Sequence, residues 1–131
     1  MNIVVGYIPT PEGLTAVEYA TRAASEKHTK LVIVNSGVHG NDTDPSFASA
    51  EELDALSDRL TAMGVEHEVR QPLQAESPAD EILNAADELD ADMIVIGLRR
   101  RSLVGKLFLG STSQQIIIDA DCPVVSVKRS L

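Results

Sequence analysis

Five short apolar segments, separated by longer segments of helical character, constrain the fold of this chain more than any other feature. They are residues 3–7, 31–34, 65–69, 93–96 and 124–127. Four of them are nearly continuous runs of apolar and β-branched side chains, which are typical of strands buried on both faces. The third alternates apolar and polar residues, as a half-exposed edge strand does. This alternation of strands and helices predicts βαβ units around a parallel sheet with right-handed connections.

The segments between the strands contain the start and stop signals of helices. Thr10 and Ser77 are each followed by proline, which predicts an N-cap with proline at the first helical position. A middle helix is expected from about residue 47 to residue 63, and Gly64 then supplies a stop. The last helix is expected to begin near Ser111.

Length and composition restrict the class of protein. A chain of 131 residues fits one domain, residues 1–131, and its 44% apolar residues suffice for a core. A net charge of −9 and only 3% aromatic residues argue against a nucleic-acid partner. No stretch approaches the roughly 20 apolar residues of a membrane span, and the single Cys122 cannot form an internal disulfide. We therefore expect a cytoplasmic protein that binds neither nucleic acid nor membrane.

The loops after the first and fourth strands are the expected place for a ligand. Ligands of open parallel sheets bind beyond the carboxyl ends of the strands, at the switch point in strand order. Gly97 allows a tight turn after the fourth strand, and Gly110, Ser111 and Thr112 open a helix whose free N–H groups favour an anion. Four of the chain's eleven basic residues lie between these points: Arg99, Arg100, Arg101 and Lys106. Together these features predict a phosphate or other anion site.

Each of these features also has an ordinary structural explanation. Three consecutive arginines are often a solvated face or a partner for acidic helices, and the step at Gly110 can be a simple N-cap. A P-loop is excluded, because that motif needs glycine and serine or threonine where Arg100 and Leu107 stand. The first strand–helix turn, residues 6–9, also lacks the glycine-rich dinucleotide fingerprint.

No catalytic residue and no metal site is predicted. The three histidines, at positions 28, 39 and 67, are scattered over separate elements without metal-ligand spacing. Cys122 is expected to be a small packed residue, since no sequence motif pairs it with a base. Ser111, Thr112 and Ser113 are better suited to capping and phosphate contact than to nucleophilic attack, because no nucleophile-elbow pattern surrounds them.

The chain resembles the universal stress protein family along nearly its whole length. The family pattern is glycine, two residues, glycine, nine residues, glycine, then serine or threonine; Gly97, Gly110 and Ser111 match its first, third and fourth places. Three further stretches are similar to family sequences: residues 79–83, 91–97 and 122–125. The resemblance implies a flavodoxin-like, adenine nucleotide alpha hydrolase-like three-layer α/β/α sandwich with five parallel strands in the order 3-2-1-4-5.

The resemblance also implies a stress-response protein that binds ATP or a related nucleotide between the loops after strands one and four, with Mg²⁺ present only alongside the nucleotide. The adenine end is expected near Pro9, Thr10 and Asn35. The phosphates are expected at Gly110, Ser111, Thr112 and the arginines Arg99, Arg100 and Arg101, and Gly97 and Lys106 complete the predicted site. In this interpretation the protein binds its ligand and is not an enzyme.

Two positions depart from the family pattern. Arg100 stands at the family's second glycine, where it either binds phosphate or blocks the site. Ile8 stands where nucleotide-binding members place an acidic residue. One alternative is therefore an interaction protein without a nucleotide, which acts through its dimer and its basic loop. A slow ATP hydrolase is a third alternative, and it lacks an identifiable base.

The last strand predicts a self-association surface. Val124, Val125, Ser126 and Val127 would lie at one edge of the sheet, where a bare apolar strand is an aggregation hazard. Pairing with the same strand of a second copy removes this hazard, although the tail that follows could also cover the edge. The resemblance favours the homodimer.

Overall fold

The structure is a computed structural model, and it describes residues 1–36, 47–72, 77–98 and 109–129. The described elements are β1 (Asn2–Gly6), α1 (Pro11–Lys27), β2 (Lys30–Val34), α2 (Ala50–Ala62), β3 (His67–Arg70), α3 (Pro78–Leu89), β4 (Met93–Leu98), α4 (Ser111–Asp119) and β5 (Val124–Lys128). The strands form one parallel sheet in the order β3-β2-β1-β4-β5. The predicted fold class and strand order are confirmed.

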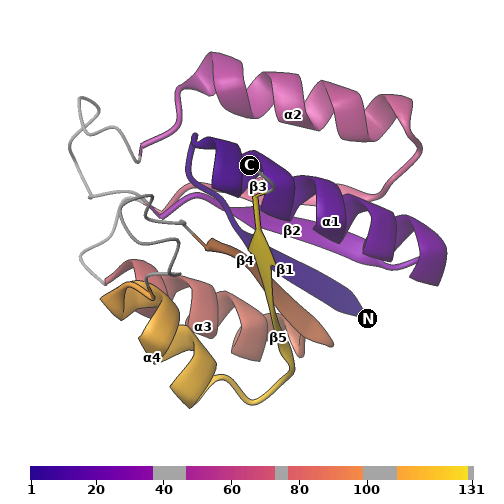
Figure 1. Ribbon diagram of the computed structural model, residues 1–131. Coiled ribbons are helices and arrows are strands. Elements are labelled where there is room, and N and C mark those ends of the chain that lie inside the picture. Colours follow the sequence, from indigo (N-terminus) through magenta and orange to yellow (C-terminus); the bar gives the residue numbers. More distant parts are fainter. Residues whose placement is uncertain (37–46, 73–76, 99–108, 130–131) are drawn as a thin grey trace.

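The sheet lies between two layers of helices (Figure 1). Helices α1 and α2 cover one face, and α3 and α4 cover the other. Side chains of a strand alternate between the two faces, so Ile3 and Val5 of β1 pack toward α1 and α2, whereas Val4 packs toward α3 and α4. Because both faces are covered, the central strands must be apolar on both sides, which explains their continuous apolar sequences.

The two edge strands differ from the three central ones. Every residue of β3 is half-buried, as the alternating pattern predicted. The expectation that residues 124–127 are buried on both faces was wrong, because these residues are only half-buried. Within the described residues β5 pairs with β4 alone, so its other side lacks the neighbour that would complete its burial.

The predicted helix signals act as expected at four places. The Thr10 side chain accepts a hydrogen bond from the N–H of Gly13 at 3.1 Å, and the Ser77 side chain accepts one from the N–H of Asp80 at 3.2 Å. Helix α4 begins at Ser111. After α2, Gly64 has a φ of 73°, the left-handed conformation that glycine adopts without strain. Helix α2 starts about three residues later than expected, because Ser49 and Glu52 form a capping box that the sequence analysis did not use.

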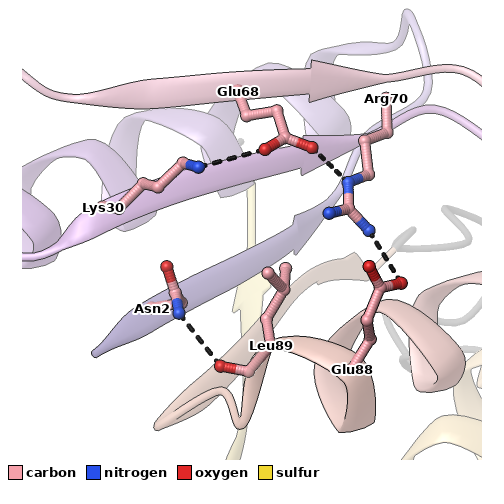
Figure 2. A network of polar contacts seen from close by, with 6 residues as sticks. All are labelled: Asn2, Lys30, Glu68, Arg70, Glu88 and Leu89. Atoms are coloured by element: carbon pink, nitrogen blue, oxygen red, sulfur yellow. Dashed lines mark hydrogen bonds and ion pairs between the residues drawn. The ribbon is translucent and has the colours of Figure 1, made fainter.

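Edge strand β3 is connected to its surroundings by a network of charged side chains (Figure 2). Lys30 of β2 donates to Glu68 at 3.0 Å, and Arg70 also donates to the Glu68 carboxylate. Arg70 reaches Glu88 on α3 at 3.2 Å. Asn2 lies nearby and donates to the carbonyl oxygen of Leu89 at 2.9 Å. Charged side chains thus connect β3 to β2 and to α3, on the face of the sheet that α3 and α4 cover.

This network predicts a pH-dependent contribution to stability. Hydrogen bonds from Arg70 and then Lys30 lower the pKa of Glu68 below its ordinary value. A carboxylate with a lowered folded-state pKa stabilises the fold at pH values above its unfolded pKa, and this contribution disappears as the pH falls through the folded value. We therefore expect Glu68→Gln to lower the free energy of unfolding at pH 7 and to lower it less at pH 3. Urea unfolding at both pH values measures this, with Glu26→Gln, at an exposed position on α1, as the control.

Candidate functional site

A cavity of about 290 Å³ opens at the carboxyl ends of β1 and β4. These strands are neighbours in the sheet, but the chain winds outward from them in opposite directions, which makes this the switch point in strand order. The lining residues are Gly6, Tyr7, Ile8, Thr10, Glu12, Gly13, Ser36, Pro78, Ile82, Ile96, Gly97, Thr112, Ser113 and Ile116. Its volume is close to the lower limit for pockets that hold small organic ligands.

Two glycines allow the first turn of α1 to approach the strand ends closely. A Cβ atom on Gly97 would lie 2.4 Å from the backbone oxygen of Glu12, and one on Gly13 would lie 1.9 Å from the backbone oxygen of Ile8. Real Cβ atoms do not approach backbone oxygens this closely, so a side chain at either position would push α1 away from the sheet. Gly97 therefore shapes one wall of the cavity, in addition to the tight turn expected from the sequence.

Three helices begin at the cavity, and their N-termini are capped differently. The first turns of α1 and α3 are capped by the side chains of Thr10 and Ser77. At α4 the N-cap is Gly110, which has no side chain with which to cap the first turn. Backbone N–H groups at a helix start carry a partial positive charge and bind anions well when they are not otherwise satisfied. Of the three, α4 thus has the N-terminus best suited to an added anion.

The other polar groups of the cavity come from three elements. Glu12, in the first turn of α1, brings a carboxylate. The hydroxyl of buried Ser36 donates to the carbonyl oxygen of Pro78 at 3.3 Å. Burial, and secondarily the negative charge of Glu52, raises the pKa of Tyr7, so its phenol stays protonated at neutral pH. The cavity therefore combines an apolar wall, hydroxyl groups, one carboxylate and the start of α4.

The structure brings several of the predicted site residues together. Thr10, Gly97 and Thr112 line the cavity. Gly110 and Ser111 immediately precede Thr112 at the start of α4. Pro9 lies between the lining residues Ile8 and Thr10. Thr10 already uses its side chain to cap α1.

Asn35 has a different position from the other predicted residues. Its side chain is fully buried and does not line the cavity. The Asn35 amide donates to the Tyr7 carbonyl at 2.8 Å, and its side-chain oxygen accepts from the N–H of Ala48 at 3.0 Å and from Gln71 at 2.8 Å. Asn35 therefore connects the end of β1, the start of α2 and the end of β3.

The basic residues that were expected to contact phosphate lie outside the described residues. They are Arg99, Arg100, Arg101 and Lys106. Their contribution to a phosphate site remains a prediction from the sequence.

Sequence reasoning missed Glu12, although it lines the cavity. Ser113, which the sequence marked as suited to capping and phosphate contact together with Ser111 and Thr112, lines the cavity as well. The signal for Glu12 was weaker, because an acidic residue in the first turn of a helix is common and has a sufficient explanation in the helix dipole.

The described residues contain no group of three or more histidine, cysteine, aspartate or glutamate side chains placed to hold a metal ion. None of the described helices has the length and apolar character needed to cross a membrane. Burial, followed by the nearby charge of Asp121, raises the pKa of the Cys122 thiol and disfavours the reactive thiolate.

Comparison with protein families and relatives adds independent information. The family model described as "Universal stress protein family" matches residues 1–128. A curated universal stress protein from Mycolicibacterium smegmatis is 38% identical over 126 residues, which cover 96% of each chain.

Solved structures give the same result. A universal stress protein from Archaeoglobus fulgidus in complex with dAMP is 26% identical, with a TM-score of 0.76 and 98% of each chain covered. A universal stress protein in complex with cAMP is 27% identical, with a TM-score of 0.73, and covers 99% of this chain and 98% of the other.

Proposed function

This chain belongs to the universal stress protein family, and we propose that it binds an adenine nucleotide, ATP or a related one, in the cavity at the carboxyl ends of β1 and β4. The observation that carries the proposal is the position of this cavity: it lies at the switch point of the sheet and is bordered by the uncapped start of α4. Two relatives with the same fold are complexes with dAMP and cAMP, which supports an adenine nucleotide as the ligand class.

The phosphate would bind at the start of α4. Its N-cap, Gly110, has no side chain to occupy the first-turn N–H groups, and Thr112 and Ser113 line the cavity. A Cβ atom on Gly110 would meet no described atom within 4 Å, and its φ of −69° is open to any residue. Neither local conformation nor packing against the described residues thus requires glycine there, which supports close approach of a ligand as its role.

The ribose or base would bind nearer to α1. Ile8 is apolar and 40% exposed, so it cannot supply the acidic contact that the family pattern places there. Glu12 lines the same cavity from the first turn of α1. Its carboxylate can accept hydrogen bonds from ribose hydroxyls or from the adenine amino group. We infer that Glu12 replaces the missing acidic group.

A thermal-shift measurement tests the proposal. Melting temperatures should be recorded with AMP, cAMP and ATP with Mg²⁺, and with inorganic phosphate as the control. A ligand at a hundred times its dissociation constant adds about 2.7 kcal/mol to the stability. For a domain of this size, that corresponds to a rise of roughly 10 °C. If no nucleotide raises the melting temperature, the proposal fails and the interaction-protein alternative becomes the leading one.

A substitution at the N-cap of α4 should change stability and binding in opposite directions. In Gly110→Asp, the new carboxylate caps the first turn and interacts favourably with the helix dipole, so the ligand-free protein should gain up to about 1 kcal/mol. The same carboxylate occupies the N–H groups and repels phosphate, so nucleotide affinity should fall at least tenfold. Calorimetry and urea unfolding measure the two effects. Gln114→Glu adds the same charge one turn further along the helix and should weaken binding much less.

We propose binding rather than turnover of the nucleotide. Among the described residues that line the cavity, Glu12 carries the only carboxylate, and histidine, cysteine and lysine are absent. Glu12 lies on the α1 side, where we place the ribose or base, so the described lining supplies no second base beside the phosphate end at α4. Incubation with the protein should leave ATP intact, and steady release of phosphate would contradict this proposal.

The single cysteine, which cannot form an internal disulfide, supports a reducing cytoplasmic location.

We further propose that the protein forms a homodimer through β5. This strand lies at the edge of the sheet and is half-buried and largely apolar. Pairing of identical strands around a two-fold axis centred on β5 places the middle residue, Ser126, opposite its own copy. Ser126→Glu would then place like charges directly opposite each other, which destabilises a strand pair. Sedimentation should show a dimer for the original chain and a monomer for this variant, whereas Met63→Glu, at the exposed C-cap of α2, should remain dimeric.

A further inference from the structure

A serine and a histidine form a close hydrogen bond far along the sheet from the nucleotide cavity. Ser57 lies on α2 and His67 lies on the edge strand β3. The Ser57 hydroxyl and Nε2 of His67 are 2.7 Å apart, and Nδ1 of His67 is 2.9 Å from the backbone oxygen of Val65. Both side chains are half-buried, so the pair is held in place and remains accessible.

These contacts determine which atom carries the proton. A carbonyl oxygen can only accept a hydrogen bond, so Nδ1 of His67 must donate to Val65. In the neutral imidazole, Nε2 then has a free lone pair and accepts the proton of the Ser57 hydroxyl. A hydroxyl that donates to a histidine which a third group orients is the arrangement of an activated nucleophile and its base.

Ser57 lies beside the buried face of its helix. Residues 53, 56 and 60 form the buried apolar stripe of α2, and residue 57 follows Leu53 by four positions, on the same side of the helix. The binary pattern would place an apolar residue there. Ser57 thus brings a hydroxyl rather than an apolar group to this side of α2, where it meets His67.

A cavity of about 350 Å³ adjoins this pair. Besides Ser57 and His67, its walls are Ala50, Leu53, Asp54, Glu68, Val69 and Gln71. Two carboxylates line it, and the described lining residues include no lysine or arginine. A reactant that enters this cavity should accordingly be uncharged or positively charged, because an anion would meet like charges.

We propose that Ser57 is an acyl-acceptor site for small uncharged esters, with His67 as its base. In this step Oγ of Ser57 attacks the carbonyl carbon of the ester while its proton passes to Nε2 of His67. The bond between the carbonyl carbon and the leaving oxygen then breaks, and the alcohol departs with that proton. The product is an ester on Ser57, and His67 is again neutral.

Reaction with p-nitrophenyl acetate tests this proposal. Release of p-nitrophenol gives the rate, and peptide mass spectrometry locates the acetyl group. We expect acetylation of Ser57 to be at least tenfold faster than that of Ser25, an exposed serine on α1. Ser57→Ala should abolish the modification in this part of the chain, whereas Ser25→Ala should leave the rate at Ser57 unchanged.

A second variant distinguishes a His67 that acts as a base from a His67 that only forms a structural hydrogen bond. The amide in His67→Gln can still accept from Ser57 but is far less basic than imidazole, so acetylation of Ser57 should slow by about 100-fold. Melting temperatures of each variant establish that it is folded. The proposal is overturned if Ser57 reacts no faster than Ser25, if His67→Gln reacts as fast as the original chain while folded, or if the stable adduct lies on His67.

Discussion

Replacing Asn35 with alanine should destabilise the fold by about 3–5 kcal/mol, a large part of the 5–15 kcal/mol typical of a whole domain. The substitution removes the partner of the Tyr7 carbonyl, of the Ala48 N–H and of the Gln71 amide at once. Tyr7 and Ala48 are buried, so water cannot readily replace the lost contacts. Urea unfolding should show a much lower midpoint with a similar slope.

Asn2→Ala is the matched control for this prediction. The Asn2 side chain donates a single hydrogen bond, to Leu89 at 2.9 Å, from a half-buried position. Its removal should cost about 1 kcal/mol. The experiment also distinguishes the two roles of Asn35. If Asn35→Ala were as stable as the original chain but bound nucleotide weakly, the ligand contact expected from the family resemblance would be correct and the structural role would be wrong.

Replacing Gly13 with alanine should destabilise the fold by about 3 kcal/mol, although alanine usually favours a helix over glycine by about 1 kcal/mol. The reason is the 1.9 Å separation between the added Cβ and the backbone oxygen of Ile8. This oxygen also accepts a hydrogen bond from the N–H of Thr10 at 2.7 Å, so the turn cannot relax without losing a contact. Thermal unfolding should show a lower melting temperature in the absence of any ligand.

Gly110→Ala provides the control, because the same added methyl group meets no described atom within 4 Å there. Its cost should stay below about 1 kcal/mol, since alanine is only a poorer N-cap than glycine. If Gly13→Ala were neutral or stabilising, the close approach of α1 to the turn after β1 would be wrong. The neighbouring wall of the cavity at the carboxyl ends of β1 and β4 would then need revision as well.

Much of the fold could be predicted from the sequence because its signals are local. Continuous apolar runs marked the central strands, and the alternating run identified β3 as a half-exposed edge. Thr10 and Ser77 capped the helices they were expected to cap, since a cap depends on three or four consecutive residues. The strand order came from the family resemblance, and the structure confirms it.

The candidate site was predicted less completely. Its residues come from segments that are far apart in the sequence, and contacts between such segments leave no local signal. Thr10, Gly97 and Thr112 were expected in the site and line the cavity, because each lies beside a strand end or helix start that the sequence marks. The burial of β5 was overestimated, because an apolar run does not show whether a strand has one neighbour or two.

The sequence by itself determined the strands, the helix starts, the family and the end of the sheet at which a ligand is expected. Only the tertiary structure decided what individual side chains do there. It showed that Asn35 is an internal connection and that Glu12 lines the cavity. It also brought Ser57 of α2 against His67 of β3. These roles depend on which atoms of distant segments meet, and packing in three dimensions, rather than any local pattern, determines that.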